Sequence, residues 1–255
     1  MSNLVVIDRP SPSVASIALN KPERRNPIGP DVRDALIPAL ESVLADDSAR
    51  AIVLCGSNGM FCSGGDISSM KQLPPQGGRA RLKAHHKLVR LFAEAEKPVV
   101  AAVEGFAMGA GGGLALLADI IVMGEGAQMG FPFFKLGLMP DYGILYTLPK
   151  RVGMGVAKQA LMLGTMYKGP EALAVGMVDK VVPDPQVMGE ALKIAEELGS
   201  HSRFATAMAK QLLAKMPESL DGALEMEAMG QALLISSADF AEGTTAFMEK
   251  RKPKF

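Results

Sequence analysis

Cysteine and histidine are scarce in this chain. Among 255 residues the only cysteines are Cys55 and Cys62, and the only histidines are His85, His86 and His201. Two cysteines are too few for a disulfide framework or a four-thiolate metal site, so both are expected to be buried or half-buried thiols. The histidines have no spacing toward nearby acids that would hold a metal ion. The sequence therefore predicts no metal site.

Net charge and long apolar segments are absent too. Lys plus Arg and Asp plus Glu each number 27, so no overall field would hold the chain on nucleic acid or an anionic membrane. No run of about 18 apolar residues is present, and residues 1–10 lack the pattern of a signal peptide. We expect a cytoplasmic protein with no nucleic-acid or membrane partner, in which local cations meet any anionic ligand.

Strand and helix signals alternate through most of the chain, which is typical of an α/β fold. A hydrophobic content of 48% is enough to bury a sizeable core. The expected strands are 4–7, 14–19, 51–55, 99–103, 120–123 and 178–182, and the expected helices among them are 31–44, 79–96 and 114–118.

The last quarter of the chain predicts only helices, at residues 186–198, 203–215, 220–234 and 238–249. Leu, Met and Ala occur on more than one face of these helices, so each should pack on a neighbour as well as on its own core. We therefore expect residues 1–195 to form the core with the site and residues 196–255 to form a helical oligomerisation region.

Two glycine-rich segments lie where a strand gives way to a helix, GSNGMFCSGGD at 56–66 and GFAMGAGGGL at 105–114. Glycine allows close backbone approach, so such turns can present N–H groups to a developing oxyanion. Taken singly, each turn is more typical of tight strand-to-helix packing. A dinucleotide fingerprint or a P-loop is poorly matched, because the required acidic residue and the GK[ST] end are missing.

Longer motifs extend these turns in both directions: LNKPERRNPIGPDV at 19–32, AIVLCGSNGMFCSGGDI at 51–67, KPVVAAVEGFAMGAGGGLALLADIIV at 97–122, MGFPFFKLGLMPDYGILYTLPKRVG at 129–153, GPEALAVGMVDKVVPD at 169–184 and AFMEKRKPKF at 246–255. In this order they resemble the crotonase superfamily, also called the enoyl-CoA hydratase/isomerase family. The resemblance implies a spiral of repeated strand-strand-helix units followed by a C-terminal helical trimerisation region. It also implies a homotrimer or a dimer of trimers.

The resemblance assigns an acyl-CoA site to particular residues. The backbone N–H groups of Gly65 and Ala110 would stabilise the thioester oxygen as an oxyanion. The residues that would hold the coenzyme A part are Arg24, Arg25, Ser63, Ile67, Phe247 and Lys250. Coenzyme A would enter as part of the substrate, and no separate cofactor is expected.

The acidic residues of the chain help to decide between the hydratase and the isomerase reaction. The two glutamates of hydratases in this family fall at Gly113 and Phe133, which cannot transfer protons. Asp141, in GLMPDYG, falls where isomerases of the family carry an acidic base, although Pro-Asp-Tyr-Gly is also a good β-turn. The remaining acids near the glycine turns are expected to have structural roles, Asp66 as a helix N-cap and Glu104 and Asp119 as hydrogen-bond or ion-pair partners.

We therefore expect an isomerase that moves a 3-enoyl-CoA double bond to position 2, with Asp141 as acid and base. Burial among Phe133, Phe134, Leu138 and Met139 should raise the proton affinity of Asp141. A hydratase-like enzyme, a thioester hydrolase, a dehalogenase-like or ring-opening enzyme and a silent acyl-CoA-binding protein remain as alternatives. Residues 72–78 and the helix at 79–96 that follows them are expected to be mobile, and His85 and His86 to be exposed.

Overall fold

The chain folds around one six-stranded sheet, seen in the computed structural model, which describes residues 3–70, 72–215 and 217–255. The strands are β1 (Val5–Ser11), β2 (Val14–Leu19), β3 (Ala51–Gly56), β4 (Val99–Val103), β6 (Ile120–Gly124) and β9 (Lys180–Val182). They lie side by side in the order β1-β2-β3-β4-β6-β9. Only β1 is antiparallel to its neighbour, which confirms the α/β class.

Alternate residues of the central strands face two separate cores. In β3, Ile52 and Leu54 belong to the larger cluster, whereas Val53 and Cys55 belong to the smaller one. This follows from the two-residue period of a strand. Because both faces are covered, these strands consist almost entirely of apolar residues.

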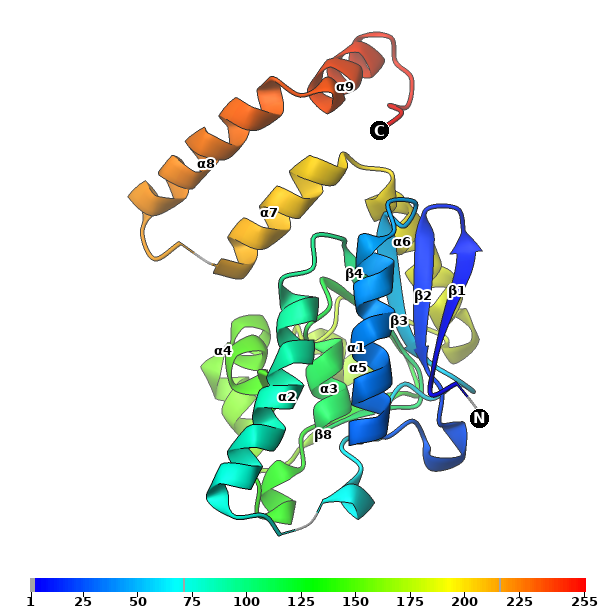
Figure 1. The fold of residues 1–255 in the computed structure, drawn as a ribbon, viewed down its shortest axis with the longest axis vertical. Coiled ribbons are helices and arrows are strands. Elements are labelled where there is room, and N and C mark those ends of the chain that lie inside the picture. The colour runs from blue at the N-terminus through cyan, green and yellow to red at the C-terminus, as the bar shows by residue number, and fades with distance from the viewer. Residues whose placement is uncertain (1–2, 71, 216) are drawn as a thin grey trace.

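Helices cover both faces of this sheet (Figure 1). On one face α1 (Pro30–Ala45), α2 (Pro75–Ala93) and α3 (Ala110–Ala115) pack over the larger core. On the other face α6 (Val187–Gly199) closes the smaller core. The helix after β7 is α4 (Ile144–Met162), and the short α5 (Gly169–Ala174) precedes β9.

A second, three-stranded sheet has the order β5-β7-β8 and consists of β5 (Phe106–Met108), β7 (Gln128–Gly130) and β8 (Met166–Lys168). A parallel bridge between Cys62 and Ala107 continues this layer onto the segment after β3. Thus β3, β4 and β6 are each followed by a short pairing segment in the second layer and then by a helix. This is the repeated strand-strand-helix unit that the sequence predicted.

The second sheet was not predicted from the sequence, because three-residue strands are too short to show a periodic pattern. Helix α4 was missed as well, since Pro149 and Gly153 interrupt its signal, and Gly153 has a non-helical φ of 73°. The helix predicted at 79–96 begins four residues earlier than expected, and the mobility of residues 72–78 and of this helix stays a prediction. Pro75 starts α2, a position that suits proline because the first N–H groups of a helix have no intrahelical acceptor.

The chain ends in α7 (Arg203–Lys215), α8 (Leu220–Ile235) and α9 (Ala238–Met248), as predicted. In Figure 1 α8 and α9 lie apart from the two sheets. The domain boundary predicted between residues 195 and 196 falls inside α6, which packs on the main sheet. None of the helices in the described part of the chain is both long and apolar enough to cross a membrane.

Candidate active site

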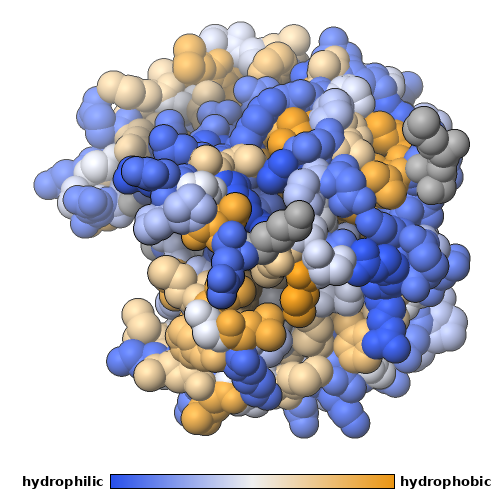
Figure 2. All heavy atoms as spheres, turned by 60° about the horizontal axis from the view of Figure 1, so that its bottom comes forward, coloured by the Kyte–Doolittle hydropathy of each residue, from blue (hydrophilic) through white to orange (hydrophobic). Residues whose placement is uncertain are grey.

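A cavity of about 580 Å³ lies between α2, the start of α3 and the segment before α4. Three predicted residues line it together: Gly65, Ala110 and Asp141. Its other walls are mainly apolar and include Leu73, Leu82, Leu138 and Met139. Figure 2 shows apolar side chains gathered near the middle of the face that is turned forward, with hydrophilic ones around them.

The two glycine-rich turns are held together by a short parallel ladder. Cys62 N–H donates to the Phe106 carbonyl oxygen at 2.7 Å, and Met108 N–H donates to the Cys62 carbonyl oxygen at 3.0 Å. This ladder fixes the segment that carries Gly65 beside the segment that leads to Ala110. Segments separated by more than 40 residues in the chain thereby come to the same cavity.

Glycine is required at two backbone positions of these turns. Gly64 has a φ of +108°, and a Cβ there would lie 2.9 Å from the Met108 carbonyl oxygen. Gly109, with a φ of +50°, stands directly before the first residue of α3. Both conformations are rarely adopted by residues with a side chain.

The N–H groups of Gly65 and Ala110 are available to a ligand. On either side of Gly65, the Gly64 carbonyl accepts from Ile28 N–H at 2.7 Å and the Asp66 N–H donates to the Ile28 carbonyl at 3.0 Å. Ala110 is the first residue of α3, so its N–H has no intrahelical acceptor. Among the described residues neither N–H donates to a protein acceptor. The pair can therefore stabilise negative charge on one oxygen.

Asp141 lies in the turn that precedes α4, and it also lines the cavity. Its carbonyl oxygen accepts from Ile144 N–H at 3.1 Å, which makes a turn, while its side chain lines the cavity. The Oδ1 atom of Asp141 is buried and has no hydrogen-bond partner among the described residues. Burial raises the pKa of Asp141 to about 6, and the charge of Arg81 acts in the opposite direction.

The apolar surroundings of Asp141 differ from the prediction. Leu138 and Met139 line the cavity, but Phe133 and Phe134 do not. Phe133 is buried with its ring near Gly109, where a Cβ would lie 3.6 Å from Cζ, and Phe134 is 48% exposed. The cavity around Asp141 is therefore lined by residues of its own segment, such as Leu138 and Met139, and by residues of α2.

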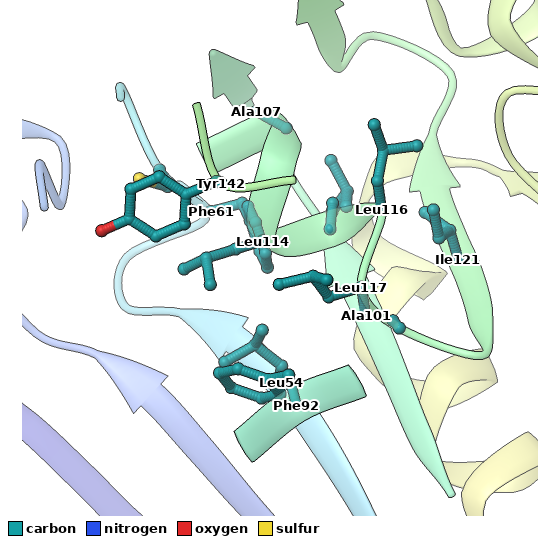
Figure 3. Packing of buried hydrophobic residues seen from close by; sticks show 14 of the residues in the cluster. Leu54, Phe61, Phe92, Ala101, Ala107, Leu114, Leu116, Leu117, Ile121 and Tyr142 are labelled. Atoms are coloured by element: carbon teal, nitrogen blue, oxygen red, sulfur yellow. The ribbon is translucent and has the colours of Figure 1, made fainter. Parts of the chain in front are cut away.

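Gly113 stands where hydratases of the family have one of their two glutamates, and the space for a side chain at this position is filled by a neighbouring residue. A Cβ on Gly113 would lie 2.6 Å from the Tyr142 Cβ and 3.1 Å from the Ile144 Cγ1. Figure 3 shows the Tyr142 ring with its hydroxyl directed away from the other labelled side chains. A carboxylate at residue 113 would thus require Tyr142 to move.

The Tyr142 hydroxyl forms a hydrogen bond with His85 Nδ1 at 3.0 Å. His85 is only 4% exposed, so the prediction of an exposed histidine is wrong here, whereas His86 is exposed. Burial is the main cause that lowers the pKa of His85 to about 4, and burial raises the pKa of Tyr142. Both groups are therefore neutral near pH 7. The sequence offered only weak signs of this pair, since it joins residues 57 positions apart.

Four of the predicted coenzyme A residues lie together next to Gly65. Ser63 N–H donates to the Arg25 carbonyl oxygen at 2.9 Å, and Arg24 pairs with Asp66 through Nη1 and Nη2 at 2.9 and 3.0 Å. Ile67 follows Asp66 and is 59% exposed. Asp66 also caps the following 3₁₀ turn by accepting from Ser68 N–H, as predicted.

Phe247 and Lys250 are not part of this group within a single chain. Phe247, at the end of α9, is 83% exposed and lines a hollow formed by the terminal helices, and Lys250 is exposed with a φ of 54°. Neither residue lines the cavity that holds Asp141. Their assignment to coenzyme A stays a prediction.

Of the other acids, Asp119 has the hydrogen-bond and ion-pair partners that the sequence predicted, whereas the Glu104 side chain has neither among the described residues. Asp119 accepts from Val99 N–H at 2.7 Å and pairs with Lys210 at 2.7 Å. Glu104 does not line the cavity, and burial raises its pKa. Cys55 and Cys62 are both buried free thiols. No group of three or more His, Cys, Asp or Glu side chains able to hold a metal occurs in the residues that the structure describes.

An α/β spiral that presents two backbone N–H groups and a buried carboxylate to one cavity defines an acyl-transfer or enolate-forming class of enzyme. A profile of the family described as "Enoyl-CoA hydratase/isomerase" matches residues 9–255. The chain belongs to this family, within the crotonase superfamily, and is an acyl-CoA enzyme.

Two curated relatives and one solved structure illustrate the similarity. The chain is 34% identical to 1,2-epoxyphenylacetyl-CoA isomerase of Escherichia coli over 95% of this chain and 94% of that protein. It is 34% identical to crotonyl-CoA hydratase of Syntrophomonas wolfei, again over 95% and 94%. A crystal structure of an enoyl-CoA hydratase from Bacillus anthracis superposes with a TM-score of 0.94 at 28% identity, covering 99% of this chain and 98% of that one.

Proposed function

We propose that this protein is an enoyl-CoA isomerase that converts 3-enoyl-CoA thioesters to 2-enoyl-CoA thioesters. The observation that carries the proposal is the Asp141 carboxylate, which shares a cavity with the Gly65 and Ala110 donors and whose buried Oδ1 has no hydrogen-bond partner in the part of the chain that the structure describes. Both an isomerase and a hydratase are among the relatives of the chain, so the choice between the two reactions depends on the acids in the site.

The mechanism needs one carboxylate and one oxyanion site. Asp141 removes a proton from C2 of the 3-enoyl thioester, and the electrons move to the thioester oxygen to give a dienolate. The N–H groups of Gly65 and Ala110 stabilise that oxygen. The protonated Asp141 then returns the proton at C4, and the double bond ends between C2 and C3. Coenzyme A serves as the handle of the substrate.

The environment of Asp141 suits this proton shuttle. A pKa of about 6 leaves the side chain mostly ionised near pH 7, ready to accept a proton, and makes it a stronger base than a solvated carboxylate, whose pKa is about 4. A hydratase of this family would need two carboxylates around one water. Gly113 and Phe133 supply neither, and the space at residue 113 is taken by Tyr142.

The test compares wild type with Asp141→Asn on a 3-enoyl-CoA and on a 2-enoyl-CoA, followed by the absorbance of the conjugated thioester. Wild type should isomerise the 3-enoyl substrate and hydrate the 2-enoyl substrate negligibly. Asp141→Asn should lose roughly 10²–10⁴-fold in kcat, the usual contribution of a general acid or base. Its dissociation constant for a saturated acyl-CoA should change little, since the donors and walls remain.

A matched control is Asp8→Asn, which changes an exposed aspartate on β1 away from the cavity and should keep the wild-type rate. An Asp141→Asn enzyme with wild-type kcat would refute the role of Asp141. A wild-type enzyme that hydrates 2-enoyl-CoA faster than it isomerises 3-enoyl-CoA would instead support the hydratase. Tight acyl-CoA binding without turnover of either substrate would support a silent binding protein.

A further inference from the structure

Helix α2 contributes three polar side chains, those of Arg81, His85 and His86, to an otherwise mainly apolar cavity wall. Arg81 and His85 are four residues apart, so they lie on the same side of the helix. Both line the cavity that holds Asp141. The reaction proposed above uses neither of them, since it requires only the carboxylate and the two backbone donors.

Among the described residues Arg81 has no protein partner. Its side chain is partly buried, and among the described residues it forms no ion pair within 4.0 Å and no hydrogen bond. Most other arginines of the chain do have partners; for example, Arg24 pairs with Asp66 and Arg151 with Asp179. The charge of Arg81 nevertheless acts on the Asp141 carboxylate, which places the guanidinium within electrostatic reach of the reacting end.

His85 adds a neutral donor on the same side of α2. The Tyr142 hydroxyl is bonded to His85 Nδ1 at 3.0 Å and has no other partner among the described residues. If the hydroxyl donates this bond, its proton is satisfied and the imidazole carries its own proton on Nε2. Nε2 has no protein acceptor in the described part of the chain, so it is free to donate into the cavity.

A purely hydrocarbon acyl group would fit this wall poorly. It would remove water from a permanently charged guanidinium and give nothing in exchange, which is unfavourable for a partly buried charge. A carboxylate would accept two parallel hydrogen bonds from the guanidinium, the geometry for which arginine is best suited. The apolar residues between, such as Leu82, Met139 and Leu145, suit the methylene chain that joins the two ends.

We propose that Arg81, with His85 beside it, binds a carboxylate at the far end of the acyl group, so that the substrates are coenzyme A monothioesters of dicarboxylic acids. This inference rests on the proposed function, because it takes the cavity of Asp141 as the acyl site. The volume of about 580 Å³ is within the roughly 300–1,000 Å³ of small-molecule pockets. A six-carbon acyl group with a terminal carboxylate is the simplest probe.

The experiment compares 3-hexenoyl-CoA with 3-hexenedioyl-CoA, which differ only in the terminal carboxylate. Wild type should show at least about tenfold higher kcat/KM for the diacid derivative, in keeping with a charge-assisted bidentate pair. Arg81→Met should lower kcat/KM for the diacid derivative roughly 10- to 100-fold and change that for 3-hexenoyl-CoA less than about threefold. Arg81→Lys should have an intermediate kcat/KM for the diacid derivative, because lysine keeps the positive charge but cannot donate two parallel hydrogen bonds to the carboxylate.

Lys83→Met is the matched control, since Lys83 is exposed on the same helix and does not line the cavity. It should leave the preference for the diacid unchanged. An equal loss on both substrates in Arg81→Met would assign Arg81 to the coenzyme A part and overturn the inference. A wild-type enzyme without preference for the diacid would overturn it as well.

A binding measurement separates this inference from the isomerase proposal. Calorimetry with the saturated thioesters hexanoyl-CoA and adipyl-CoA requires no reaction. Wild type should bind adipyl-CoA at least about tenfold more tightly, and Arg81→Met should abolish the difference. If that preference is found but no 3-enoyl thioester is isomerised, the carboxylate site stands and the isomerase proposal fails. If isomerisation is found without the preference, only the carboxylate site fails.

Discussion

At the scale of single residues, Asp141 belongs to a turn and lines the cavity at the same time. The backbone of Asp141–Ile144 forms a turn, with positive φ at Tyr142 and Gly143, and the Asp141 side chain at its start lines the cavity. Tyr142 in turn fills the space in front of Gly113. The sequence showed that both hydratase glutamates are missing, but only the structure shows that one of their positions is closed.

Burial of Asp141 carries a cost in stability that depends on pH. In the unfolded chain its pKa is near the model-peptide value of about 3.9, whereas in the folded protein it is raised to about 6. The folded state therefore holds the proton more tightly, and ionisation destabilises the fold as the pH rises through the window from about 4 to about 6. Below that window the two states are protonated alike and the cost vanishes.

Asp141→Asn should accordingly stabilise the protein at pH 7.5 by roughly 1–3 kcal/mol and have little effect at pH 4. The measurement is the free energy of unfolding from urea titrations of both proteins at the two pH values. Taking the difference between variant and wild type removes the contributions of all other carboxylates. A variant that is less stable than wild type at pH 7.5 would show that the Asp141 carboxylate is favourably solvated or paired in the folded state.

At the scale of elements, the oxyanion donors depend on contact between two loops that are distant in the chain. The loop after β3 carries Gly65, and the segment from β5 into α3 carries Ala110. The two segments pair through a parallel bridge between Cys62 and Ala107 of β5. Gly64 lies so close to the Met108 carbonyl oxygen that a Cβ would not fit there. The spacing of the two N–H groups is thus set by backbone packing.

Gly64→Ala should therefore reduce kcat by about 10²-fold or more, because the loop must shift and displace the Gly65 N–H, and loss of one oxyanion donor typically costs that much. Gly59→Ala is the matched control in the same loop: Gly59 also has a positive φ, of 64°, but a Cβ there meets nothing within 4 Å. Steady-state kinetics with 3-enoyl-CoA would measure both. Comparable rates for the two alanine variants would contradict this account of the loop.

At the scale of the whole molecule, the terminal helices expose more apolar surface than a monomer normally does. Large side chains on α7, α8 and α9 are widely exposed, among them Leu213 at 74%, Leu233 at 66% and Phe247 at 83%. Hollows of about 470 and 370 Å³ between these helices are lined mostly by apolar residues. Large apolar patches of this kind mark protein interfaces, which agrees with the predicted oligomerisation region.

We expect the protein to form a homotrimer or a dimer of trimers through these helices. Light scattering after gel filtration should give three or six times the single-chain mass of 26.9 kDa. The double change Leu213→Asp and Leu233→Asp should lower that mass, because buried unpaired charges are strongly unfavourable. Ile7→Asp, on the edge strand β1, should leave it unchanged. A single-chain mass for wild type at micromolar concentration would contradict the expectation.

The sequence by itself determined the α/β class, the main-sheet strands, the terminal helices and the family, because long apolar runs, helical periods and ordered motifs are local or linear features. It also singled out Gly65, Ala110 and Asp141. It could not show the second sheet, the burial of His85 or that Arg81 lacks an ion pair and a hydrogen bond among the described residues. These features depend on which segments meet in the folded protein. Strand pairing in the second sheet, the loss of water around His85 and the lack of a partner for Arg81 within the described residues arise only when the chain is packed.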